Sequence, residues 1–360
     1  MRKNICLVID RLDGGGGGER FVLSLAQAFS KYNCRVDVIT SSDESSYPLD
    51  TFTFNVHFIR KMNRSILNIQ NAKYLQNKIT DIGVDFDLVI SSLLHTDRIC
   101  KKLNMPNTYY CIHGALSTVV DSRANRKIGF SNFRRKIYSH LIRKLYENQN
   151  IITVSDGVKQ DLIKLGIQAK AMQVIYNPFD FDDIKQQSKA YPIEDQDYII
   201  HVGRFGVEKR HDLLVNAYKQ SGIKQKLLLL GDGETIEQTK QLVTDLKLTN
   251  QVIFKGFNPN PFPYIKNAKA LVLSSDFEGF GMVLVEALIL GVPIISTNAL
   301  SGPREILVDE LKPFLSPTGD VKALAKNIRK MINNPIKITN KYTDRFSAEE
   351  SVKKYLALCD

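Results

Sequence analysis

Short apolar runs alternate with helical patterns along most of this chain of 360 residues. The first run, residues 5–9 (ICLVI), leads into a glycine-rich loop and then into an amphipathic helical pattern that starts at Glu19. The runs VDVIT, FDLVISS, TYYCIH and IITVS follow, and each one enters a polar or helical segment. This alternation predicts βαβ units that build a mostly parallel sheet.

The strand-like runs form two series with a polar segment between them. The second series begins at residues 198–204 (YIIHVGR) and continues through four more apolar runs, the last at 292–297. Residues 177–197 are polar and interrupted by prolines, which is typical of a linker. The length of the chain allows each series its own core. We therefore predict two similar α/β domains whose ligands bind in a cleft, at the carboxyl ends of the strands.

Composition limits the class of protein. Hydrophobic residues make up 43% of the chain and charged residues 24%, as in ordinary soluble domains. The N-terminal apolar run is too short for a signal peptide, and no uncharged run approaches the roughly 18 residues that a membrane span needs. The five cysteines are scattered and never spaced Cys-x-x-Cys, which argues against a disulfide framework and a zinc site. We expect a cytoplasmic protein.

Residues 277–293, FEGFGMVLVEALILGVP, carry the most specific chemical signal. Glu278 stands in a glycine-rich turn, and Glu286 follows eight positions later inside a helix expected to start near Met282. The free N–H groups at such a helix start, and its dipole, favour an anion. The carboxylates accept hydrogen bonds from hydroxyls. A nucleotide-sugar needs both kinds of group, whereas the simpler interpretation is a strand–turn–helix whose glutamates face solvent.

This stretch resembles the Glu-x7-Glu signature of glycosyltransferase family 4, the group 1 glycosyltransferases. These are retaining enzymes with the GT-B fold. The resemblance implies two Rossmann-like domains with parallel sheets facing a central cleft. Residues 1–180 would form the acceptor-binding domain and residues 181–340 the nucleotide-sugar-binding domain, with a helix at about 341–360 packing back on the first. It also implies that Glu278 holds hydroxyls of the donor sugar and Glu286 those of the ribose. The amides implied to face the sugar and phosphates are those of Phe280, Gly281, Met282 and Val283.

A second motif follows the run at 198–204. Gly203, Arg204 and Lys209 match the family's Gly-Arg-x4-Lys pattern, whose cations are implied to grip the donor diphosphate. Fixed cations are needed because the leaving group develops negative charge as the glycosidic bond breaks. The alternative is a solvated basic loop. By the same resemblance, the backbone at Gly231 and Lys255 lines the nucleoside pocket.

The glycine loop at residues 13–20 opens a helix, and this arrangement can cradle a phosphate. No Gly-Lys-Ser/Thr follows, so the loop is not a P-loop. It resembles the family's Gly-Gly-Ala-Glu-Arg loop, with Gly16 and Gly17 as the two glycines and Gly18 in place of the usual alanine. His113, at the end of another strand, is implied to lie beside the donor sugar, although histidines at strand ends are often purely structural.

Two Asp-x-Asp pairs raise the question of a metal. Asp85 and Asp87 precede a strand, at the wrong end for a site, and Asp180 and Asp182 lie in the linker. We therefore expect a metal-independent enzyme with no cofactor beyond its nucleotide-sugar donor.

The net charge of +11 is concentrated in the first half, where residues 1–180 carry 25 Lys and Arg against 16 Asp and Glu. Residues 123–144 hold eight of these bases and no acid. Phe130, Phe133 and Ile137 begin an apolar stripe in this segment at helical spacing, continued by Leu141 and Leu145. A basic amphipathic helix is typical of a surface that meets anionic lipid. The alternative is a helix whose stripe is core. Nucleic acid is not expected, because no nucleic-acid-binding motif appears.

The resemblance, taken with these features, implies a retaining hexosyltransferase-type glycosyltransferase at the inner face of the cytoplasmic membrane. It would move a sugar from a nucleoside diphosphate, with UDP expected, to a hydroxyl of a glycan acceptor in surface polysaccharide, lipopolysaccharide or lipid-linked oligosaccharide synthesis. Two alternatives stay open: a UDP-sugar 2-epimerase of the same fold, and a membrane-associated nucleotide-sugar binder without catalysis.

Overall fold

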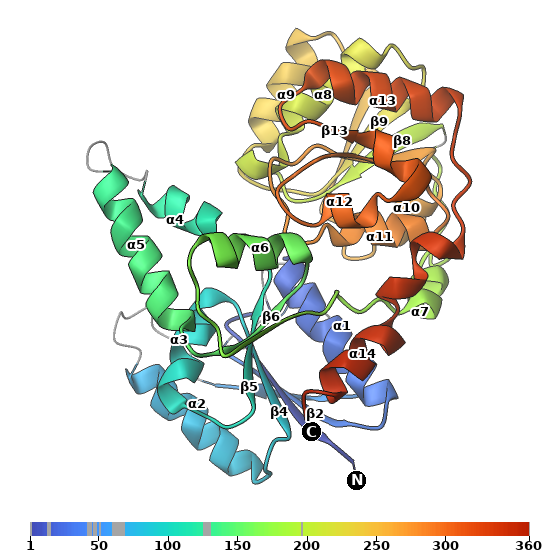
Figure 1. The fold of residues 1–360 in the computed structure, drawn as a ribbon. Coiled ribbons are helices and arrows are strands. Elements are labelled where there is room, and N and C mark those ends of the chain that lie inside the picture. Colours follow the sequence, from blue (N-terminus) through green and yellow to red (C-terminus); the bar gives the residue numbers. More distant parts are fainter. Residues whose placement is uncertain are drawn as a thin grey trace. The chain divides into compact units, whose positions relative to one another are not determined.

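The computed structural model describes residues 2–12, 16–41, 45, 49, 52–59, 69–124, 131–195 and 197–359. The chain forms two compact units (Figure 1). The first unit contains Met1–Pro178 and Ala348–Asp360, and the second contains Phe179–Ser347.

The first unit is built on a parallel seven-stranded sheet in the order β3-β2-β1-β4-β5-β6-β7. Its strands are β1 (Asn4–Ile9), β2 (Arg35–Thr40), β3 (Asn55–Phe58), β4 (Leu88–Ser92), β5 (Thr108–Ile112), β6 (Asn150–Thr153) and β7 (Ala171–Val174). The central strands are buried on both faces, which explains why they are continuous apolar runs instead of alternating patterns.

Helices cover both faces of this sheet (Figure 1). They are α1 (Gly17–Lys31), α2 (Ile69–Ile82), α3 (Leu94–Leu103), α4 (Leu116–Ala124), α5 (Ser131–Tyr146), α6 (Asp156–Lys164) and α14 (Ala348–Leu356). The last of these returns from the end of the sequence and packs against α1, with the rings of Phe29 and Tyr355 5.8 Å apart. The Ser351 hydroxyl donates to the Tyr176 carbonyl at 2.9 Å, so α14 is part of the first unit's core.

The second unit has a parallel six-stranded sheet in the order β10-β9-β8-β11-β12-β13. Its strands are β8 (Tyr198–Val202), β9 (Lys226–Leu230), β10 (Val252–Gly256), β11 (Ala270–Leu273), β12 (Ile294–Thr297) and β13 (Leu315–Ser316). Its helical segments are α7 (Phe181–Gln187), η2 (Val207–Lys209), α8 (His211–Ser221), α9 (Ile236–Asp245), α10 (Phe262–Lys266), α11 (Met282–Ile289), α12 (Pro303–Ile306), η3 (Asp309–Phe314), α13 (Val321–Asn333), η4 (Asn340–Tyr342) and η5 (Asp344–Phe346).

The end of the second unit differs from the sequence prediction of a helix at about 341–360 on the first domain. The helix begins only at Ala348, and residues 341–347 belong to the second unit. Tyr342 and Phe346 explain this, because both are buried there. The Phe346 ring lies 5.5 Å from Phe280, and the Tyr342 hydroxyl donates to Glu310.

Strand order reverses once in each sheet. In the first unit the reversal lies between β1 and β4, and in the second between β8 and β11. At such a point the loops from two neighbouring strands turn to opposite faces of the sheet, which leaves a crevice at their carboxyl ends. Both reversals therefore mark where side chains from distant segments can meet around a ligand.

Candidate functional site

The loops that follow β8 and β11 meet at the strand reversal of the second unit. Lys209, at the end of η2, places its Nζ 2.5 Å from Oε1 of Glu278, and their side chains are only 20% and 10% exposed. The Ser275 hydroxyl donates to the same Glu278 oxygen at 2.6 Å. The two residues that the sequence places 69 positions apart thus form one partly desolvated, charge-assisted hydrogen bond.

Arg210 ties these two loops together. Its Nη1 donates to both carboxylate oxygens of Asp276, at 3.1 and 3.0 Å, while Nε and Nη2 pair with Asp212, each at 3.0 Å. The residue adopts a left-handed conformation with φ of +52°, which is strained for a side chain other than glycine. The guanidinium thus connects the segment that carries Lys209 to the segment that carries Glu278.

Glycines let the surrounding loops approach each other at backbone distance. Gly231, after β9, has φ of +147°, and a Cβ there would lie 2.0 Å from the carbonyl oxygen of Gly203. Gly302 has φ of +55°, and its Cβ would lie 2.1 Å from the carbonyl oxygen of Phe280. No side chain fits at either position without moving a backbone, so these glycines fix the shape of the site.

The expected helix start is present at Met282. Gly281 caps α11 with φ of +91°, and the amides of Met282 and Val283 lie in the first turn, where backbone N–H groups have no intrahelical acceptor. Glu286 is 1% exposed on this helix. The Phe280 side chain is buried in the core, so only its backbone remains for a ligand.

Two buried histidines, His201 and His211, lie close to the Lys209–Glu278 pair. His201 Nδ1 contacts the Val272 carbonyl at 2.9 Å, so this nitrogen carries the proton. Its Nε2 has no partner among the described residues and would lie 3.3 Å from a Cβ at Gly203. Burial lowers the pKa of His201 to about 4 and that of His211 to about 2, so both rings are neutral at pH 7. Neither histidine is among the residues predicted from the sequence.

Arg204 and Lys255 are not joined to the central pair. The Arg204 side chain is 66% exposed and pairs with Glu208 at 3.0 Å. Lys255 pairs with Asp195 at 2.6 Å. Lys209 is thus the predicted cation that the structure brings to Glu278.

The remaining predicted residues lie in the first unit. Gly16 is the N-cap of α1 and Gly17 its first residue, while the loop before them, residues 13–15, lies outside the described residues. His113 follows β5, packs edge-on against Phe21 with ring centroids 4.6 Å apart, and has a buried Nε2 without a partner in the described part of the chain. Burial lowers its pKa to about 4. The ring is therefore neutral at pH 7.

A carboxylate–imidazole pair at the first unit's strand reversal was missed by the sequence analysis. Asp10 follows β1, and its Oδ1 lies 3.0 Å from Nδ1 of His95, which follows β4. The carboxylate can only accept, so Nδ1 carries a proton in this contact. Asp10 directly follows a strand-like run, and His95 lies three positions after the next one, in the first turn of α3. This closeness to strand ends was the available signal. What the sequence lacked was the knowledge that β1 and β4 are neighbours.

Neither a metal cluster nor a membrane span is found in the described ranges. No group of three or more His, Cys, Asp or Glu in those residues could hold a metal ion. None of the helices described there combines the length and the apolar character needed to cross a bilayer.

Comparison with known proteins accounts for both units. Residues 15–183 match the family described as Glycosyltransferase Family 4, and residues 183–349 match Glycosyl transferases group 1. An N-acetylgalactosamine-N,N'-diacetylbacillosaminyl-diphospho-undecaprenol 4-alpha-N-acetylgalactosaminyltransferase from Campylobacter jejuni is 26% identical, over 95% of this chain and 96% of its own. A lipopolysaccharide 1,6-galactosyltransferase from Salmonella typhimurium is 25% identical, over 92% of this chain and 90% of its own.

The fold has solved counterparts as well. The crystal structure of Anabaena HepE in complex with UDP and glucose matches with a TM-score of 0.78 at 20% identity, covering 99% of each chain. The two family matches together extend over residues 15–349, and with two parallel-sheet α/β units they confirm the expected fold. The chain belongs to the group 1 glycosyltransferases and has the GT-B fold.

Proposed function

We propose that this protein is a retaining glycosyltransferase that moves a sugar from a UDP-sugar to a hydroxyl of a glycan acceptor, without a metal ion. The observation that carries the proposal is the contact between Lys209 and Glu278. In a nucleotide-sugar, one oxygen joins the anomeric carbon to the diphosphate. A cation for the phosphate and a carboxylate for the sugar must therefore lie side by side, as these two groups do.

Each partner keeps capacity for a donor. The Lys209 ammonium has three N–H groups and uses one on Glu278, so two can turn to phosphate oxygens. One Glu278 oxygen receives both Lys209 and Ser275, while the other can accept from a sugar hydroxyl. The start of α11 adds amide donors for the diphosphate, and Glu286 is assigned to the ribose hydroxyls.

The chemistry assigned to these groups begins with cleavage of the glycosidic bond, through a transition state with oxocarbenium character. Lys209 and Arg204 stabilise the charge that develops on the departing diphosphate. That phosphate then takes the proton of the acceptor hydroxyl, which attacks from the same face, so configuration is retained. Glu278 orients the sugar, His113 is assigned a place beside it, and no side chain is assigned as a covalent nucleophile.

The relatives guide the choice of substrates. The Anabaena structure contains UDP, and the relatives from Campylobacter and Salmonella are named for a diphospho-undecaprenol-linked glycan and for lipopolysaccharide. We assign UDP as the nucleotide, and as acceptor a glycan of surface polysaccharide, lipopolysaccharide or lipid-linked oligosaccharide synthesis.

We also propose that the protein works at the inner face of the cytoplasmic membrane, through α5. Phe133, Ile137 and Leu141 repeat every four residues and are 63%, 43% and 48% exposed, whereas Ile142 and Tyr146 on the opposite side are buried. The stripe at these three positions is thus not core, unlike Leu145, which is buried. Residues 125–130, including Phe130, lie outside the described residues. An exposed apolar stripe with basic flanks suits an anionic membrane surface.

A donor panel tests the catalytic proposal. Wild-type protein is incubated with UDP-, GDP- and ADP-sugars, with and without extracted lipid-linked glycans, and products are measured by mass. We expect acceptor-dependent release of UDP that survives chelation by EDTA, and a Glu278→Gln variant that binds UDP within about threefold of the wild type but turns over on the order of 100-fold more slowly. Wild-type turnover by Glu278→Gln under saturating donor would refute the assignment. Epimerised UDP-sugar without acceptor would instead favour the epimerase, and a protein that binds but never consumes donor would be a non-catalytic binder.

A further inference from the structure

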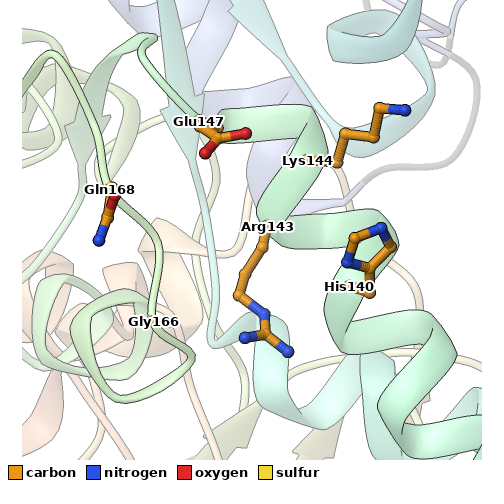
Figure 2. Close-up of a pocket in the computed structure, with 6 residues that line it drawn as sticks. All are labelled: His140, Arg143, Lys144, Glu147, Gly166 and Gln168. Atoms are coloured by element: carbon orange, nitrogen blue, oxygen red, sulfur yellow. The ribbon is translucent and has the colours of Figure 1, made fainter.

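An open cleft lies on the first unit, between the C-terminal turns of α5 and the loop that follows α6. Figure 2 shows the residues that line its volume of about 460 Å³. They are His140, Arg143, Lys144, Glu147, Gly166 and Gln168. Backbone hydrogen bonds fix its rim, because Asn148 N–H donates to the Gln168 carbonyl at 2.8 Å and Lys170 N–H to the Gln149 carbonyl at 2.9 Å. The cleft lies outside the site described above and has the size of a small-molecule site.

Arg143 and Lys144 are both cations that line this cleft, and Arg143 is the one that contacts the facing loop. Its Nε donates to the Ser139 carbonyl at 3.3 Å, which holds the side chain along the helix. Its Cδ and Nη1 lie 3.6 and 3.9 Å from the position that a Cβ at Gly166 would take (Figure 2). Within the described ranges no acidic group pairs with Arg143 or Lys144, so their charge is not neutralised by the protein. A guanidinium held this way suits the oxygens of a phosphate.

Glu147, directly after α5, and Gln168, in the facing loop, restrict the chemical class of the ligand. Glu147 and Gln168 also line the cleft, and a carboxylate there repels a bare phosphate. A carboxylate and an amide accept hydrogen bonds from hydroxyls. The combination therefore fits a phosphate ester that also carries hydroxyls.

The position on α5 indicates where such a ligand comes from. Lys136, His140 and Arg143 recur at three- and four-residue steps along one side of the exposed stripe of Phe133, Ile137 and Leu141. A lipid whose acyl chains lie along that stripe would bring its headgroup to the cleft. We propose that the cleft binds the polyol-phosphate headgroup of a membrane lipid, with the phosphate on Arg143 and the hydroxyls on Glu147 and Gln168. This inference rests on the membrane contact of α5 proposed above.

A pair of matched substitutions on α5 tests the proposal. Arg143→Gln and Arg135→Gln remove the same charge from the same helix, but Arg135 is paired with Asp121 at 2.9 Å and does not line the cleft. Full-length variants are sedimented with vesicles of phosphatidylcholine that contain phosphatidylglycerol or, at equal surface charge, phosphatidylserine. We expect Arg143→Gln to weaken binding to phosphatidylglycerol vesicles about fivefold and Arg135→Gln less than twofold. Equal losses of vesicle binding in the two variants would show that only general electrostatic attraction acts, and would refute headgroup binding in the cleft.

Two further measurements test the preference for a polyol headgroup and whether the ligand is a lipid or a soluble molecule. Glu147→Gln is expected to abolish the preference of the wild type for phosphatidylglycerol over phosphatidylserine, and the absence of any preference in the wild type would contradict the polyol assignment. Free glycerol phosphate should compete only at millimolar concentration. If free glycerol phosphate bound as tightly as the vesicles do, the ligand would be a soluble polyol phosphate and the assignment to a lipid would be wrong.

Failure of this inference can be told apart from failure of the proposals on which it rests. Phe133→Ser tests the membrane contact. If Phe133→Ser detaches the protein from vesicles while Arg143→Gln binds like the wild type, the membrane contact of α5 is supported and lipid binding in the cleft is refuted. UDP binding, measured on the same variants, should be unchanged throughout because the cleft contains no donor-site residue.

Discussion

Replacing Arg210 with glycine should separate the positioning of the Lys209–Glu278 pair from the stability of the second unit. The change removes ion pairs to Asp212 and Asp276, whose side chains are 58% and 36% exposed, so their combined loss costs about 1 kcal/mol. It also relieves a left-handed backbone conformation, which returns about 1 kcal/mol. The two effects nearly cancel, and we expect a Tm within about 3 °C of the wild type.

Turnover should respond differently. Without the guanidinium, the Asp276 N–H still donates to the Glu208 carbonyl at 2.9 Å and the Ser274 hydroxyl to the Lys209 carbonyl at 2.7 Å, so the loops stay joined. The Asp276 carboxylate, however, loses the bidentate contact that fixes its orientation next to Glu278. A displacement of about 1 Å at a reacting centre can cost on the order of 100-fold in rate. We expect Arg210→Gly to lower kcat for transfer from the donor about ten- to hundredfold, with the donor KM changed less than threefold. Steady-state UDP release and differential scanning fluorimetry give the two readouts.

Lys247 supplies the matched control. It has φ of +57°, is exposed, and lies just past the end of α9. Lys247→Gly should therefore raise Tm by about 2–4 °C through relief of strain alone and leave kcat unchanged. The reasoning would be refuted if Arg210→Gly kept wild-type kcat, or if it unfolded many degrees below the wild type while Lys247→Gly gained stability.

Three further changes test other parts of the structure. Burial raises the pKa of Asp97 to about 7, so the folded state holds a proton that the unfolded state releases near pH 4. The free energy of unfolding should therefore fall as pH rises from about 4 to 7. Asp97→Asn should flatten this pH dependence, measured by denaturant titrations. Gly302→Ala should cost more than about 3 kcal/mol because its Cβ meets a backbone carbonyl, whereas Gly319→Ala, with φ of +75° in open space, should cost only about 1 kcal/mol. Ser275→Ala removes one hydrogen bond to Glu278 and should lower kcat about tenfold without changing UDP affinity, measured by calorimetry.

The fold could be predicted largely from local signals. Apolar runs and turn residues fix where strands and helices begin, and the start of α11 at Met282 followed from the glycine before it. The α5 stripe shows the limit of such signals. Helical spacing cannot tell a buried face from an exposed one, and only the packing of Ile142 and Tyr146 shows which side of the helix is core.

The site was predicted as separate motifs and not as contacts. Which strand ends lie together depends on the lateral order of strands, and a sequence pattern does not contain that order. Lys209 and Glu278 meet because β8 and β11 are neighbours, and Asp10 meets His95 because β1 and β4 are neighbours. The role of Arg210 was equally hidden, because its partner Asp276, 66 positions away, becomes close only after both loops have folded.

The placement of α14 has a consequence for how the protein is made. Residues 348–359 complete the core around Phe29 and Tyr355, yet they are synthesised after the whole second unit. At typical translation rates this interval is on the order of ten seconds. During that time the nascent first unit exposes the apolar surface that α14 later covers, so chaperone binding and aggregation during translation should concentrate there.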